Sequence, residues 1–267
     1  MDKEQLATEK SPGIQSFQRL KNFFLEVSGI ASFVGRFFKE VFLPPYEFSE
    51  FQKQSYLIGY RSLSLVGITG FIMGLVLTIQ AKPTMAEFGA ESWIPGMVAV
   101  SLIREIGPVI TALICAGKVG SGIGAELGSM KVTEQIDAME VSGTNPFNYL
   151  VVTRVLASTF MVPVLAILSE TIGLFGSYIG VNITGKVSLR FFFTQVFASL
   201  DFIDIYPAII KTFFFGFTIG IVGCYKGYTS NKGTEGVGAA ANSAVVIASL
   251  LVFVIDMIAV QITSILI

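Results

Sequence analysis

Between Arg61 and Lys82 the chain runs for about 20 residues without a charged side chain, and this stretch constrains the fold more than any other feature. As a helix, about 20 residues extend about 30 Å, which is the thickness of the hydrocarbon core of a bilayer. The whole chain is also poor in charge, because 14% of its residues are charged and 52% are hydrophobic. A soluble domain with about 25% charged residues covers its surface more fully. The sequence therefore predicts a membrane protein.

Four more apolar stretches follow the first, and polar or charged segments separate them. They are residues 96–125, 146–180, 206–225 and 237–267. The separating segments are residues 82–95, 126–145, about 186–204, and 226–236. Each apolar stretch is long enough to cross a bilayer as a helix. We therefore expect an all-α membrane protein with five transmembrane helices.

The first 60 residues differ from the rest. Residues 1–13 are polar and lack the apolar core and cleavage site of a secretory signal, so we expect a flexible cytoplasmic N-terminus. From Ile14 to Leu43 apolar side chains recur at helical spacing among many Lys, Arg and Glu residues. That charge is too dense for a span, and it favours an amphipathic helix in the cytoplasmic interface, within an interfacial region of residues 14–60. A helix packed on a soluble domain is the alternative, although no segment for such a domain remains.

This placement predicts the topology of the transmembrane domain, residues 61–267. With the N-terminus in the cytoplasm, segments 126–145 and 226–236 are cytoplasmic. The C-terminus is then external. The positive-inside rule supports this orientation mainly through the basic N-terminal region, because Lys and Arg occur on both sides of the later spans.

Several functional classes are excluded by composition. The chain has no histidine, which excludes His-based catalytic triads, HExxH zinc sites and His-ligated haem. A net charge of -1 without a concentrated basic face excludes a nucleic-acid partner. Cys115 and Cys224 lie in apolar stretches and are expected to pack as small apolar groups. We expect no catalytic centre, metal site or cofactor in this chain.

Arg104 and Glu105 stand together inside an apolar stretch and precede Gly107-Pro108, which should kink or unwind the helix. Adjacent helical residues point about 100° apart, so the two charges are not expected to neutralise each other on one face. An ionisable residue at membrane depth is a candidate functional residue, and we expect this pair to face a polar cavity. The alternative is a pair that snorkels to the external interface. Glu170 and Asp256 are weaker candidates of the same kind.

Small residues recur every four positions in the second apolar stretch, and they form a ridge of Ala116, Gly120, Gly124 and Gly128. Shorter versions occur at Gly70 and Gly74 and at Gly216 and Gly220. Such ridges let helices approach closely in lipid. The pattern fits a crossing within the chain or an interface between subunits equally well.

The segment between the second and third spans is charged and helix-prone. Its apolar residues, including Leu127, Met130 and Ile136, offer a stripe beside an acidic face. We therefore expect a discrete cytoplasmic helix over about residues 126–143. Such a helix can dock in a groove of a soluble partner, or lie on its own protein.

Two runs of sequence resemble a known family. The run REIGPVITALICAGKVGSGIGAELGSMKVTEQIDAMEVSGTNPFNYLVVTRVLA, residues 104–157, closely resembles the signature region of the MlaE/YrbE family of ABC-transporter permeases. The run GVGAAANSAVVIASLLVFVIDMIAVQI, residues 236–262, is similar to that family's final segment. One departure is that Ala239, Ala241 and Asn242 stand where the family usually has a basic residue and a Thr pair.

The resemblance implies a homodimeric permease of the bacterial inner membrane that moves phospholipids between the inner and outer membranes. It implies two partners: an MlaF-like ABC ATPase, which hydrolyses the ATP, and an MlaD-like MCE-domain lipid-binding protein. It also makes residues 126–143 the coupling helix. The expected contacts with the ATPase are Glu126, Met130, Lys131, Thr133, Glu134, Gln135 and Asp137.

The resemblance places the Arg104–Glu105 pair near the lipid cavity. A phospholipid needs a cation for its headgroup and apolar walls for its tails, and Met73, Leu77 and Gln80 of the first span are candidates for the wall. Two other functions stay open. One is a transporter driven by an ion gradient, and the other is a membrane scaffold that recruits a cytoplasmic partner.

Overall fold

The computed structural model of the chain describes residues 12–183, 185, 187–230 and 233–266. All regular structure in this part is helical, which confirms the predicted all-α class. Five helical segments are long and apolar enough to cross a membrane, as predicted. They are Phe48–Glu87, Glu91–Val132, Phe147–Asn182, Phe202–Tyr228 and Glu235–Ile265.

The chain divides into two units, residues 1–44 and residues 45–267, and each is described by itself. The first unit contains helix α1, Pro12–Glu40. Lys39 stands in its last turn, where a cation interacts favourably with the helix dipole. The predicted flexible segment, residues 1–13, falls almost entirely outside the described residues, and the interfacial position of α1 stays a prediction.

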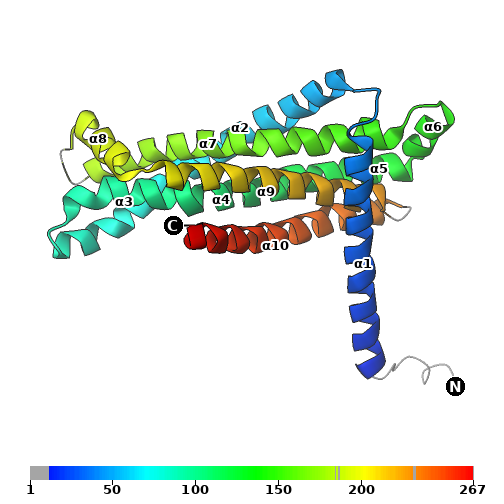
Figure 1. Cartoon of the computed structure of the whole chain (residues 1–267), viewed down its shortest axis with the longest axis horizontal. Helices are drawn as coiled ribbons and strands as arrows, with labels where there is room; N and C mark the ends of the chain where they lie inside the picture. The colour runs from blue at the N-terminus through cyan, green and yellow to red at the C-terminus, as the bar shows by residue number, and fades with distance from the viewer. Residues whose placement is uncertain (1–11, 184, 186, 231–232, 267) are drawn as a thin grey trace. The chain divides into compact units, whose positions relative to one another are not determined.

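The second unit is a bundle of the five membrane segments, drawn lengthwise in Figure 1. The first segment is α2, Phe48–Glu87, and the fourth is α9, Phe202–Tyr228. The fifth is α10, Thr234–Leu266. The third joins the π-helical turn η4, Phe147–Val152, to α7, Thr153–Asn182.

The second membrane segment is the most irregular. It consists in order of η1 (Glu91–Trp93), α3 (Ile94–Ser101), η2 (Leu102–Ile106), α4 (Gly107–Cys115), η3 (Ala116–Gly120) and α5 (Ser121–Val132).

The helices extend beyond the apolar stretches that predicted them. Helix α2 begins at Phe48, whereas the stretch without charge begins after Arg61. Its 40 residues extend about 60 Å, twice the hydrocarbon thickness. The apolar stretch marks the part of a helix that lies in lipid, and the backbone hydrogen bonds continue past it.

Small residues bring the helices together within the chain. A methyl group at Gly74 would overlap the carbonyl oxygen of Gly173, so α2 and α7 cross in backbone contact. At Gly124 it would lie 3.3 Å from the carbonyl oxygen of Ala240 on α10. At Gly120 it would lie 3.5 Å from Ile219 on α9. The ridge of the second segment is therefore used for crossings inside this chain.

The disturbance expected at Gly107-Pro108 takes the form of a π-helical turn, η2. The backbone N–H of Gly107 donates to the carbonyl of Leu102, five residues earlier. Pro108 has no N–H to donate, which favours a local widening of the helix over a regular ladder. A second π-helical turn, η3, contains Lys118. Such turns are frequent at functional sites.

The polar segment expected to connect the third and fourth spans is not an irregular loop. The polar segment of about residues 186–204 contains helix α8, Leu189–Ser199. Its residues Phe192 and Val196 are one turn apart and fully buried against Ile94 and Val98 of α3. The charges on either side made the segment look polar, although it contains a short amphipathic helix. The apolar stripe of this helix covers the end of the bundle.

The predicted helix over residues 126–143 is not continuous. Glu126 to Val132 complete α5, the end of the second membrane segment. The chain then turns at Glu134, which has a left-handed backbone with φ of 58°. A separate short helix, α6, follows over Gln135–Val141. In Figure 1, α6 lies at the opposite end of the bundle from α8.

Candidate functional site

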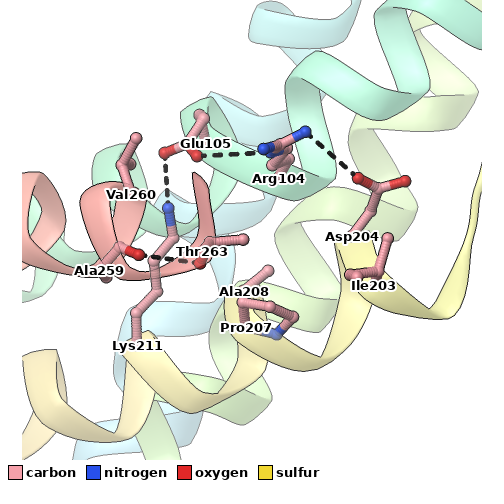
Figure 2. A pocket seen from close by; sticks show the side chains of 10 residues that line it. All are labelled: Arg104, Glu105, Ile203, Asp204, Pro207, Ala208, Lys211, Ala259, Val260 and Thr263. Atoms are coloured by element: carbon pink, nitrogen blue, oxygen red, sulfur yellow. Dashed lines mark hydrogen bonds and ion pairs between the residues drawn. The ribbon is translucent and has the colours of Figure 1, made fainter. Parts of the chain in front are cut away.

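A cluster of charged side chains links three membrane segments, and Figure 2 shows the part of it formed by Arg104, Glu105, Asp204 and Lys211. Lys211 on α9 is its centre, with only 4% of its side chain exposed. Its Nζ donates to Oε2 of Glu105 at 2.6 Å and to Oδ1 of Asp256 at 2.8 Å. Glu105 belongs to η2 and Asp256 to α10. One buried cation thus connects the second, fourth and fifth segments.

Arg104 lies at the more open side of this cluster, with 36% of its side chain exposed. Its Nη1 is 3.6 Å from Oδ1 of Asp204, at the start of α9. The other carboxylate oxygen of Asp204 accepts the backbone N–H of Asp201 at 3.2 Å, so the capping box of α9 fixes this partner. Asp204 therefore has a structural role as well as an electrostatic one.

Arg104 and Glu105 do approach each other, contrary to the expectation from an ideal helix. Nε of Arg104 lies 3.9 Å from Oε1 of Glu105, within the widened turn η2. Both side chains face one small pocket, together with Lys211 (Figure 2). The pocket is lined by Arg104, Glu105, Ile203, Asp204, Pro207, Ala208, Lys211, Ala259, Val260 and Thr263. A small pocket of about 10 Å³ therefore lies beside this pair, and residues of α9 and α10 complete its lining.

The other two intramembrane carboxylates occupy different places. Asp256 is part of the cluster, as described. Glu170 of α7 packs against Gly107, where an added methyl group would lie 2.7 Å from its Cγ. The close approach of Gly107 thus places Glu170 beside the turn that carries Arg104 and Glu105.

The predicted wall residues of the first span do not join the pocket. Met73, Leu77 and Gln80 are absent from its lining. Leu77 packs instead on the apolar core between α3 and α8, and Gln80 is exposed. The structure gives these residues no contact with the charged cluster, and their role in substrate binding stays a prediction.

A second buried cation lies towards the α6 end of the bundle. The side chain of Arg154 on α7 is 2% exposed. It donates from Nη2 to Oε1 of Glu126 at 2.8 Å and from Nη1 to the carbonyl of Leu150 at 2.9 Å. Glu126 was predicted to contact an ATPase. Its carboxylate is instead paired with Arg154 inside the bundle, and half of its side chain is exposed.

The remaining predicted coupling residues surround the turn between α5 and α6. Lys131 donates to Asp137 at 2.8 Å across the turn. Gln135 donates to the hydroxyl of Thr133 at 3.0 Å, and Thr133, Glu134 and Gln135 are exposed. Met130 is half-buried. The structure brings these residues together at one end of the bundle.

Sequence reasoning missed Lys211, Asp204 and Arg154. Lys211 is a lone charge in an apolar stretch, and the same signal that marked Arg104 was available for it. The pairing itself joins residues far apart in sequence, which a periodicity does not show.

Comparison with known proteins decides the family. The family model described as permease MlaE matches residues 51–262. The chain belongs to the MlaE permease family. The match includes the charged cluster, the turn between α5 and α6 and all five membrane segments except their outermost residues.

The names of similar proteins support the same family assignment for this MlaE-family permease. A probable ABC transporter permease protein of Rickettsia typhi is 41% identical over 215 residues, which cover 79% of this chain and 82% of the relative. A probable ABC transporter permease protein of Synechocystis is 37% identical over 202 residues, covering 76% and 77%. The intermembrane phospholipid transport system permease protein MlaE of Haemophilus influenzae is 36% identical over 207 residues, covering 77% and 79%. The chain is thus an ABC transporter permease and a multi-pass membrane protein.

Proposed function

We propose that this permease moves phospholipids between the inner and outer membranes as the membrane-spanning subunit of an ABC transporter. In this proposal a separate MlaF-like ATPase supplies the energy and an MlaD-like MCE-domain protein exchanges the lipid. Two copies of the permease form the membrane unit. The similarity to the phospholipid transport permease of Haemophilus influenzae supports the substrate class.

The observation that carries the proposal is the charged cluster inside an apolar bundle. Buried Lys211 holds Glu105 and Asp256, which leaves Arg104 as the more exposed cation of the pocket. The guanidinium is 3.6 Å or more from its carboxylate partners, distances too long for strong charge-assisted hydrogen bonds. A phosphate can therefore gain bidentate hydrogen bonds from Arg104, while the tails contact the apolar faces of the bundle.

The turn between α5 and α6 supports the proposed link to an ATPase. Glu134 adopts a left-handed backbone that costs a residue with a Cβ about 1 kcal/mol. Such strain concentrates at functional positions. Val141, at the end of α6, is 90% exposed. A strained turn at the start of α6 and an exposed apolar side chain at its end support a docking element for a cytoplasmic subunit. In this proposal the N-terminus is cytoplasmic and the C-terminus periplasmic.

The test is ATP-dependent lipid transfer by the complex isolated from its native membrane. Proteoliposomes containing labelled phospholipid should transfer it to an acceptor only with ATP, and a protonophore should have no effect. Transfer that follows an ion gradient without ATP would favour a secondary transporter. A complex that recruits its partner but transfers no lipid would favour a scaffold.

The role of Arg104 is tested by Arg104→Ala, which should reduce transfer about ten-fold or more while the subunits still co-purify. The matched control is Arg190→Ala, because Arg190 is an exposed arginine of α8 outside the pocket. Transfer unchanged by Arg104→Ala would remove Arg104 from the mechanism.

A further inference from the structure

A second groove lies between α2 and the η3–α5 part of the second membrane segment. It has a volume of about 250 Å³. Its lining mixes apolar and charged side chains: Gln54, Leu57, Ile58, Arg61, Ser62, Lys118, Val119, Gly122, Ile123 and Glu126. None of these residues belongs to the pocket around Arg104.

The groove contains two cations with no carboxylate partner among the described residues. Neither Arg61 nor Lys118 forms an ion pair there, whereas Arg104, Arg154 and Lys211 all do. The ammonium of Lys118 donates to the backbone carbonyl of Arg61, which holds the two residues together. The acidic side chain in the lining, Glu126, is bound by buried Arg154. The groove therefore carries an excess of positive charge.

The depth of these cations is set by the helices that carry them. Arg61 immediately precedes the uncharged stretch of α2, so it marks one boundary of the hydrocarbon core. Lys118 follows Arg104 by fourteen positions on the second segment, or about 21 Å of helix. The two cationic sites thus lie at different depths, and Lys118 is on the side nearer α6.

We propose that this groove binds the phosphate of a glycerophospholipid headgroup in the leaflet at the α6 end. Arg61 and Lys118 supply the charge-assisted hydrogen bonds, and Leu57, Ile58 and Val119 contact the start of the acyl chains. This deepens the proposed transport function, because it gives the permease one headgroup site near each boundary of the bilayer. A free phosphate would satisfy the cations but would leave the apolar lining without a contact.

Gly122 keeps the groove open. An added Cβ there meets nothing within 4 Å, and the same holds for Gly117 five positions earlier, outside the lining. A leucine at Gly122 should therefore fill the groove without a clash inside the chain. Gly117→Leu, in η3 of the same membrane segment, is the matched control for the same change in size.

The experiment is photo-crosslinking of the isolated complex, without ATP, in vesicles of phosphatidylethanolamine and phosphatidylglycerol carrying ³²P-labelled lipid. A photoreactive phenylalanine derivative replaces Leu57 in the groove, or Val164 on α7, which is exposed outside it. We expect a labelled adduct at both sites. The double change Arg61→Gln and Lys118→Gln should lower the adduct at position 57 about ten-fold and leave that at 164 unchanged.

Gly122→Leu should lower the same adduct, and Gly117→Leu should not. Equal labelling at position 57 with and without the two cations would overturn the proposal, and so would a crosslink to a second copy of the chain in place of lipid. Because no ATP is used, this result is independent of transport. A groove without lipid would refute the headgroup site, whereas lost ATP-dependent transfer would refute the proposed function.

Discussion

At the scale of single residues, Lys211 is the most consequential side chain of the bundle. It pairs with two carboxylates and is 4% exposed. Its removal leaves Asp256 without this cation and Glu105 with Arg104, 3.9 Å away. Breaking a buried ion pair in this way costs about 3–5 kcal/mol. We predict that Lys211→Met lowers the free energy of unfolding by this amount, measured by denaturant titration in mixed micelles.

The control is Lys53→Met, because Lys53 is 65% exposed in its pair with Glu50 and should cost less than about 1 kcal/mol. Adding Glu105→Gln and Asp256→Asn to Lys211→Met should recover most of the loss. Equal stability of the single and triple variants would show that charge compensation is not the function of Lys211.

The sequence marked only part of this cluster. Arg104, Glu105 and Asp256 were predictable, because a charge within an apolar stretch is costly and therefore conspicuous. Their partners were not, because Lys211 meets Glu105 across 106 positions of the chain. The pairing depends on how α9 packs on η2, and no local pattern encodes that.

At the scale of helices, close backbone crossings hold the bundle together. A methyl group at Gly74 would overlap the backbone of Gly173. Because both contacting groups belong to the backbone, no flexible side chain can move to relieve the overlap. We predict that Gly74→Ala destabilises the permease by about 1–3 kcal/mol, measured by the same denaturant titration. Gly238→Ala on α10 is the control, because nothing lies within 4 Å of the added methyl group, and it should be neutral or stabilising.

Hydropathy predicted the number of spans, since each must cover the same hydrocarbon thickness. It did not predict α8, because the burial of Phe192 depends on α3 and not on lipid. It also did not predict the break at Glu134, where the backbone conformation is unusual for a glutamate. Helices that cross the bilayer can be predicted from hydropathy. Helices and turns that depend on contacts with other parts of the chain cannot.

At the scale of the whole molecule, the two ends of the bundle have different chemistry. The charged pocket is formed where α9 begins and α10 ends, while the α6 end carries the strained turn and the Arg154–Glu126 pair. Arg154 ties α7 to the end of α5, and in the proposed function a movement of α6 would therefore move two membrane segments together. A rigid-body shift of this kind could link ATP hydrolysis at one end to the pocket at the other.

This arrangement makes Glu134 a test of where the ATPase docks. Glu134→Lys reverses an exposed charge at the turn, and we predict that it reduces ATPase co-purification about ten-fold or more. Glu134→Gly removes the charge but favours the left-handed backbone, so it should weaken capture without loss of stability. Glu91→Lys should leave capture unchanged, because η1 directly precedes α3, which packs against α8 at the other end of the bundle. If both Glu134 variants retain the ATPase, the docking surface does not include this turn. If Glu134→Gly loses stability and ATPase together, the turn is a structural element, and the force must enter the bundle elsewhere.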